Sequence, residues 1–315
     1  MSTPRRCLLV AATVAALGCR KQAEEPHGSP VLMQVLWEVE GVSQLVWSRD
    51  PDAGAATMAS ASPSKIDFVF DRRLDGARIE DNVNGNPVPK ANPPITVAWP
   101  DMATTMATPP FVADVFYNSL PTFGPSTTYA FVRPRVPGFP SATEVTFSLD
   151  ANGLTSIYGE PMNGPPAITV TTTALTVTLP TTTATVPTSY LAAIAFSTRA
   201  AETAAVAPFI HVATGGVTLP FTLAPGAGDT KRIYIAPAVC LGGWPAGVRV
   251  DITADAGLPD GFGRPLAAAA KGSFMTATIG APPIDGGCAP TDAGASDAST
   301  TTDDAGSADA TDAVD

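Results

Sequence analysis

A glycine-rich segment that occurs twice, at residues 150–162 and 254–266, constrains this chain more than any other feature. The copies, which we call the first and second glycine loops, align without a gap and match at six positions: Gly153 with Gly257, Leu154 with Leu258, Tyr158 with Phe262, Gly159 with Gly263, Pro161 with Pro265 and Met162 with Leu266. An alternating apolar run precedes each copy and a threonine-containing run follows it, so each copy is predicted to be a turn between two strands. The chain is therefore predicted to contain two copies of one β module.

The composition also favours an all-β chain with two domains. The 315 residues are 45% hydrophobic and include 32 prolines and 27 glycines, and short alternating runs between such residues are typical of strands. We expect one domain over residues 31–175 and a second over residues 176–279, with an insertion in the first around residues 84–123.

Local patterns predict individual elements. Alternation predicts a strand over residues 66–70 that buries Ile66, Phe68 and Phe70, and another over residues 31–39 that buries its odd-numbered residues. Asn84-Gly85 predicts a hairpin turn, because both residues tolerate a positive φ. We expect residues 180–188 to be a connection, residues 217–223 a single strand and residues 199–207 a helical turn.

The first 19 residues are typical of an export signal. Arg5 and Arg6 precede an apolar core of about eleven residues, which is too short to span a bilayer as a helix. The ending Ala16-Leu-Gly-Cys19 resembles the lipobox of bacterial lipoproteins, although Ala16 stands where Leu is usual. The resemblance implies acyl chains on Cys19 and attachment to a membrane of the cell envelope. The alternative is an ordinary cleaved signal, an incidental Cys19 and a soluble periplasmic protein.

Two segments are expected to be disordered. Residues 20–30 have mixed charge with Pro and Gly and no apolar periodicity, as in a flexible tether. Residues 280–315 are rich in Asp, Ala, Ser and Thr, and within them residues 285–315 contain eight aspartates and no basic residue. This tail and a formal net charge of −11 argue against a nucleic-acid partner, and isolated aspartates in a flexible chain do not preform a calcium site.

Cys240 and Cys288 are the two cysteines outside the leader and the lipobox. An even pair in an exported protein suggests a disulfide, which would close a loop of 48 residues and stabilise the fold by about 4 kcal/mol. Two unpaired thiols are the alternative, since geometry decides whether the bond forms.

No catalytic, cofactor or metal motif is found in the sequence. His27 and His211 are the only histidines, and the sequence contains no nucleophile elbow, zinc-protease motif or phosphate loop. Ser62-Pro-Ser-Lys65 has Ser-x-x-Lys spacing, but that motif requires a helix, which Pro63 disfavours. We therefore expect no enzymatic activity, no cofactor and no metal, although paired carboxylates of a hydrolase would leave no spacing signature.

Both modules resemble the bacterial Ig-like domains of surface-layer and other secreted envelope proteins. The resemblance lies in a strand ending in Phe-Asp or Phe-Ser (residues 66–71 and 191–197), a Thr-Tyr pair after a Pro-containing turn (residues 124–131) and the glycine loops. It implies two tandem Ig-like β-sandwiches in which the sheets serve as a scaffold.

We expect a lipid-anchored cell-envelope protein that acts as a non-catalytic adhesion, binding or spacer module. An envelope protein or a glycan is the expected partner besides the membrane. A structural subunit of an envelope assembly is the main alternative, and an uncharacterised hydrolase is a further one.

Overall fold

The computed structural model describes residues 27–102, 114–119, 128–134 and 138–279. Its regular elements are nearly all strands, and the two α-helices within the described residues, α2 (Gly76–Ile79) and α4 (Thr203–Val206), are one turn long. The all-β class predicted from the sequence is confirmed. The predicted signal, Cys19 and the acidic tail lie outside the described residues.

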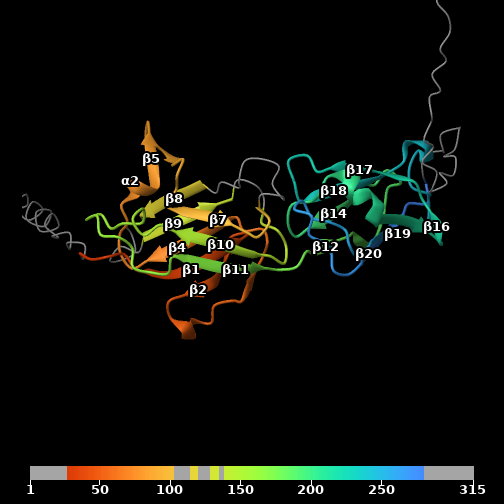
Figure 1. Ribbon diagram of the computed structural model, residues 1–315. Coiled ribbons are helices and arrows are strands. Elements are labelled where there is room, and N and C mark those ends of the chain that lie inside the picture. Colours follow the sequence, from red (N-terminus) through yellow and green to blue (C-terminus); the bar gives the residue numbers. More distant parts are fainter. Residues whose placement is uncertain (1–26, 103–113, 120–127, 135–137, 280–315) are drawn as a thin grey trace, which may run out of the picture.

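Two large sheets and one two-stranded sheet, β5 (Glu80–Val83) with β6 (Asn86–Pro89), form the first half of the molecule, residues 27–172 (Figure 1). One sheet has the order β2 (Val42–Ser48), β1 (Leu32–Val39), β4 (Lys65–Phe70), β9 (Thr128–Arg133) and β8 (Asp114–Ser119). The other has the order β3 (Met58–Ala59), β11 (Ala167–Thr172), β10 (Glu144–Leu149) and β7 (Ile95–Ala98). Trp37 and Phe68 from the first sheet and Phe147 from the second meet in one core, so the sheets pack face to face.

Two further sheets form the second half, residues 177–279. One contains β12 (Val177–Thr178), β14 (Ala192–Phe196), β18 (Arg232–Pro237) and β17 (Phe221–Pro225), in that order. The other contains β13 (Thr181–Val186), β20 (Ala270–Thr276), β19 (Arg249–Ala254), β15 (Ile210–Thr214) and β16 (Val217–Thr218). Ile194, Ile235, Ile252 and Phe274 are among the residues of a second core between these sheets.

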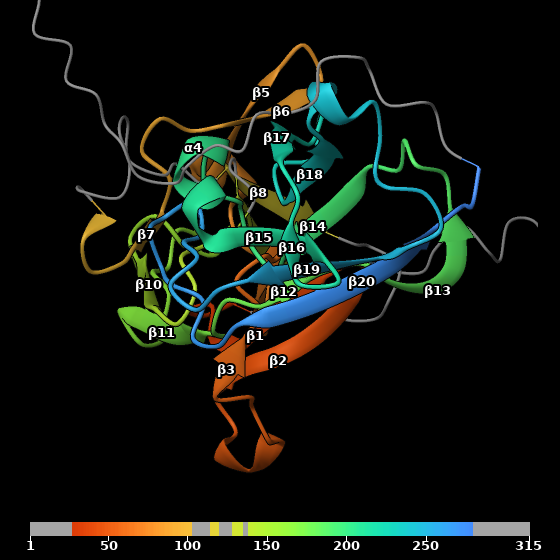
Figure 2. The ribbon, with the colours of Figure 1, turned by 90° about the vertical axis from the view of Figure 1, so that its right-hand side faces the viewer.

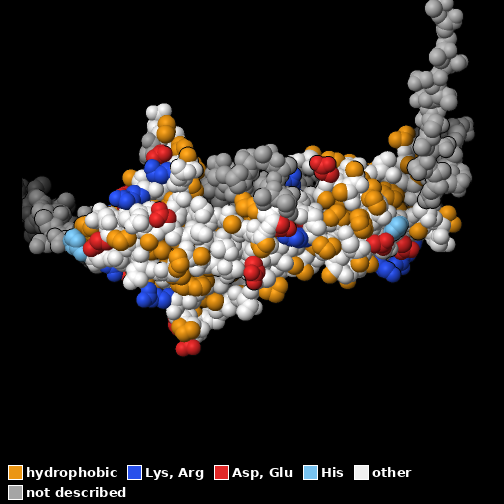
Figure 3. All heavy atoms as spheres, viewed as in Figure 1, with side chains coloured by type: hydrophobic (Ala, Val, Ile, Leu, Met, Phe, Trp, Pro, Cys, Tyr) orange, Lys and Arg blue, Asp and Glu red, His pale blue; other side chains and the backbone are white. Residues whose placement is uncertain are grey.

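The halves follow one another along a single long axis (Figures 1 and 2). The described residues that precede β1 lie at one end, and β16 lies at the other. On the face drawn in Figure 3, acidic and basic side chains of the described residues are dispersed over both halves. Within the described residues no helix is long and apolar enough to cross a membrane.

The topology repeats as well as the sequence. Each glycine loop connects two antiparallel neighbours, β10 with β11 in the first half and β19 with β20 in the second. A strand that pairs in parallel flanks each of these hairpins, namely β3 on β11 and β13 on β20. The two halves therefore share their central β-hairpin and its parallel neighbour.

Several local predictions are confirmed. Ile66, Phe68 and Phe70 are fully buried. Asn84 (φ 54°) and Gly85 (φ 85°) form the turn between β5 (Glu80–Val83) and β6 (Asn86–Pro89), as a two-residue hairpin of this type requires.

Three predictions need correction. Val35 and Trp37 are buried as predicted, but at the start of β1 Leu32 is buried and Met33 is 39% exposed, because the register shifts between Leu32 and Gln34. Residues 180–188 were predicted to be a connection but contain strand β13, which lies at the edge of its sheet. Its side chains are mostly exposed, so the sequence has no apolar alternation there that would predict a strand. Residues 217–223 belong to two strands in different sheets, β16 and β17, and Pro220 lies between them.

Candidate functional site at the junction of the two halves

The two glycine loops are built in the same way. Ser156 Oγ accepts hydrogen bonds from the backbone N–H groups two and four positions later, at 3.2 and 3.3 Å. Asp260 stands at the same place in the second loop, and its Oδ1 accepts the two corresponding bonds at 2.9 and 2.8 Å. One side-chain oxygen therefore holds each loop in shape, as Asx and Ser/Thr turns do.

Asp260 also joins the two halves. Its side chain is buried, at 1% exposure, and its second oxygen, Oδ2, accepts a hydrogen bond from the backbone N–H of Ser141 in the first half at 3.2 Å. A serine has only one side-chain oxygen, so Ser156 lacks this second acceptor. Three backbone donors satisfy the buried carboxylate, as a buried charge requires.

Phe262, at the tip of the second glycine loop, packs inside the first half. It is 4% exposed and belongs to the hydrophobic cluster of the first half. Its ring contacts Trp99 edge to face, and Trp99 in turn contacts the buried Phe139. Tyr158 occupies the same position in the first loop but is 43% exposed.

Backbone and hydroxyl contacts continue the junction. Ser62 Oγ donates to the carbonyl oxygen of Ser197 at 2.8 Å, and Thr198 Oγ1 donates to that of Phe139 at 2.9 Å. Gly138 allows this approach. It has a φ of 95°, and a Cβ atom there would lie 2.5 Å from Thr198 Oγ1 and 2.7 Å from the carbonyl oxygen of Ala61.

An ion pair lies at the rim of the junction. Arg264 Nη2 donates to both carboxylate oxygens of Asp101, at 2.7 and 2.8 Å. The two side chains are 28% and 37% exposed, and a pair this close to water contributes at most about 1 kcal/mol. The buried aromatic and carboxylate contacts therefore dominate the junction.

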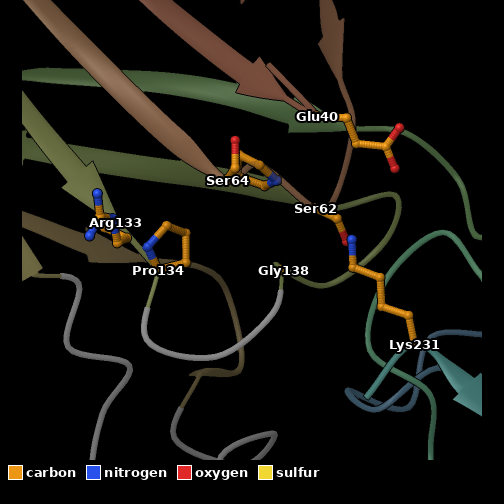
Figure 4. A pocket seen from close by; sticks show the side chains of 8 residues that line it. Glu40, Ser62, Ser64, Arg133, Pro134, Gly138 and Lys231 are labelled. Atoms are coloured by element: carbon orange, nitrogen blue, oxygen red, sulfur yellow. The ribbon is translucent and has the colours of Figure 1, made fainter. Parts of the chain in front are cut away.

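A pocket of about 420 Å³ opens beside the junction (Figure 4). Glu40, Ser62, Pro63, Ser64, Arg133, Pro134 and Gly138 line it from the first half, and Lys231 lines it from the second. Figure 4 shows the Lys231 side chain reaching toward Ser62. The lining combines charged and hydroxyl side chains with the apolar carbons of Pro63 and Pro134.

Two residues of a charged cluster on the sheet that contains β1 and β4, Lys65 and Asp67, have shifted pKa values. Lys65 Nζ lies 3.2 Å from Glu38 Oε2 and 3.0 Å from Asp67 Oδ2. Burial raises the pKa of Asp67, and Lys65 offsets only part of this effect. Burial acts in the opposite direction on Lys65, but hydrogen bonds to Asp67 and Glu38 outweigh it and raise its pKa.

The structure does not bring the predicted site residues together. Cys240 lies in the 3₁₀ turn η3 (Val239–Leu241) of the second half, whereas Cys19 and Cys288 lie outside the described residues, so the lipid site and the disulfide stay predictions. His211 is a surface residue, with Nε2 2.8 Å from Asp255 Oδ2. Ser62 of the Ser-x-x-Lys sequence lies in a loop. No group of three metal-ligating side chains occurs among the residues described.

Sequence reasoning missed the junction residues Asp260, Phe262 and Trp99. The repeat did contain a signal, because the two loops differ where their contacts differ: Ser156 becomes Asp260, Tyr158 becomes Phe262 and Glu160 becomes Arg264. In a repeat, a position that gains an acceptor oxygen or loses a hydroxyl is a candidate for a contact present in only one copy.

Comparisons with known proteins give little further information. No family model matches the sequence, and no curated protein matches it significantly. Among solved structures, the chain has some similarity to the crystal structure of the N-terminal part of the bacterial S-layer protein SbsC. The identity is 11%, the TM-score is 0.25, and the match covers 85% of this chain and 46% of that one. This chain thus spans about half of that structure, and a similarity of this size supports no inference about fold or function.

Proposed function

We propose that the protein is a lipid-anchored cell-envelope protein in which two Ig-like sandwiches form a stiff, non-catalytic spacer. The observation that carries this proposal is the burial of Phe262 of the second half in the core of the first half. Domains of one chain move relative to each other unless their interface is large and hydrophobic. A phenylalanine shared with the neighbouring core, and a buried carboxylate that binds across the junction, oppose bending.

The anchor in this proposal is Cys19, at the end of the lipobox-like sequence. Each buried methylene contributes about 0.8 kcal/mol, and two or more acyl chains hold a protein stably on a membrane. A disulfide between Cys240 and Cys288 would fasten the start of the acidic tail to the second half.

Two measurements test the spacer function. Metabolic labelling with a palmitate analogue should label the wild-type protein and not Cys19→Ala, and the variant should leave the membrane fraction.

Pulsed electron spin resonance between one spin label in each half should give a single narrow distance distribution. A broad distribution of distances between the two spin labels would contradict the spacer function. A wild-type protein that takes up no palmitate analogue would contradict the lipid anchor.

The pocket beside the junction supports a second candidate, in which the protein binds an envelope protein or a glycan. Lys231 supplies hydrogen-bond donors from the second half, and the Glu40 carboxylate supplies acceptors from the first half. A pull-down from envelope extracts should then recover a partner with the wild type and lose it with Lys231→Ala. Retention of every recovered partner by that variant would reject binding at this pocket.

A further inference from the structure

Residues 27–31, which we call the lead-in segment, lie against the first glycine loop. The His27 ring stacks on Tyr158, with the centroids 3.8 Å apart and the planes at 21°. The backbone N–H of Gly28 donates to Glu160 Oε2 at 2.6 Å. Asn163 N–H, just beyond the loop, donates to the carbonyl oxygen of Pro30 at 2.8 Å.

Contacts with the end of β4 hold the same segment from its other side. Arg72 Nη1 donates to the carbonyl oxygen of His27 at 2.6 Å. Val31 N–H donates to Asp71 Oδ1 at 2.8 Å, and Asp71 N–H donates back to the Val31 carbonyl oxygen at 3.0 Å. The predicted tether of residues 20–30 therefore includes a part, from His27 onward, that is held against the first half.

These contacts use the loop positions that join the two halves. Tyr158 stacks on the lead-in segment where its counterpart Phe262 packs on Trp99. Glu160 binds the lead-in segment where its counterpart Arg264 binds the first half.

The strand ends correspond too. Arg72 and Thr198 each follow the last phenylalanine of a strand, β4 or β14, by two residues. The Arg72 side chain donates to the carbonyl oxygen of His27, and the Thr198 side chain donates to that of Phe139. Each of these carbonyl groups is next to a glycine with a positive φ, Gly28 or Gly138. The lead-in segment therefore contacts the first glycine loop and the end of β4 in the same way as the first half contacts the second glycine loop and the end of β14.

We infer that the first glycine loop is a docking site for the lead-in segment and that this docking turns the loop end of the first half toward the membrane. The inference rests on the proposed lipid anchor at Cys19. His27 follows Cys19 by eight residues, and eight extended residues span at most about 28 Å. The docked end therefore stays close to the lipid surface, and the end with β16 points away from it.

Fluorescence quenching tests the orientation on the full-length, acylated protein in phosphatidylcholine vesicles that contain a headgroup-labelled quencher lipid. A fluorophore introduced by click chemistry replaces either Ile157 in the first glycine loop or Val217 in β16, which are 41% and 65% exposed. We expect quenching at residue 157 to exceed that at residue 217 several-fold. Equal quenching on vesicle-bound protein would overturn the orientation and leave the spacer proposal intact. If the wild-type protein carried no acyl chains and did not bind vesicles, both the orientation and the lipid-anchored spacer would be overturned.

Hydrogen exchange tests the docking itself. In the wild type, the peptide that contains residues 27–31 should be protected, and Tyr158→Ala should speed its exchange at least tenfold and reduce quenching at residue 157. His211→Ala, at the only other histidine, is the control and should change neither. An unprotected lead-in segment in the wild type would overturn the inference.

Discussion

Phe262 of the second half lies edge to face against Trp99 of the first half, with the ring centroids 5.9 Å apart and the planes at 83°. Such pairs prefer this geometry, which adds about 1 kcal/mol to the effect of burial alone. The residues are 163 positions apart in the chain, so the contact couples the two halves and its loss should be visible in both.

Phe262→Ala should destabilise the protein by about 3 kcal/mol, the usual cost of truncating a buried phenylalanine. The cavity would open in the core of the first half although the residue belongs to the second half. Denaturant titration followed by tryptophan fluorescence measures the loss.

Tyr158→Ala is the matched control, because Tyr158 occupies the same loop position but is 43% exposed. We expect its cost to be about 1.5 kcal/mol, because the variant loses the stacking contact with His27 but opens no cavity in the core. Equal losses for the two variants would show that Phe262 does not contribute to the core of the first half.

Asp260→Ala should cost about 3 kcal/mol, because it leaves three backbone N–H groups without their acceptor. Asp260→Ser should cost only about 1 kcal/mol, since a serine holds the first glycine loop at this position. Thermal unfolding of both variants checks the order. A serine variant as unstable as the alanine variant would mean that the loop bonds contribute little.

Gly138→Ala should disturb the junction. The substitution strains a residue with a φ of 95° and places a methyl group 2.5 Å from Thr198 Oγ1, so the halves must separate or shift. Gly216→Ala is the control, with a φ of 86° and no atom within 4 Å of the new Cβ. Backbone strain of about 1 kcal/mol is common to both, and crowding adds about 1 to 3 kcal/mol at Gly138 alone. Equal losses of stability would contradict close packing at Gly138.

Asp71 should make the protein sensitive to acid. Burial acts against its carboxylate, but hydrogen bonds from Arg72 and from Val31 N–H outweigh burial and lower its pKa. Its contribution to stability is therefore present above the unfolded pKa of about 3.9 and is lost as the pH falls through the lower folded value. Urea titrations from pH 2 to 6 should show a flatter acid limb for Asp71→Asn than for the wild type.

Asp67 should have the opposite slope in the same titrations. Burial raises its pKa in the fold, so the stability of the protein falls as the pH rises from the unfolded pKa through the folded one. Asp67→Asn should remove this fall. If Asp67→Asn and Asp71→Asn changed the pH dependence of stability in the same direction, the raised pKa of Asp67 would be wrong.

Patterns within a few residues predicted much of the fold. The alternation of Ile66, Phe68 and Phe70 and the turn at Asn84-Gly85 depend on local backbone preference and on one buried face, which a sequence records directly. The first strand was harder, because a bulge after Leu32 moves the buried positions by one, and alternation alone does not locate a bulge.

The sequence by itself determined the all-β class and the duplication of the glycine loop, since turn chemistry and period-two burial are local properties. Only the tertiary structure decided that Phe262 is buried while Tyr158 is half exposed, and that His27 is held by the first loop. These outcomes depend on which surface lies beside each loop, and contacts between residues far apart in the chain fix that surface. Two loops of related sequence can therefore meet different neighbours: the second loop packs on the first half, and the first loop packs on the five residues of the lead-in segment.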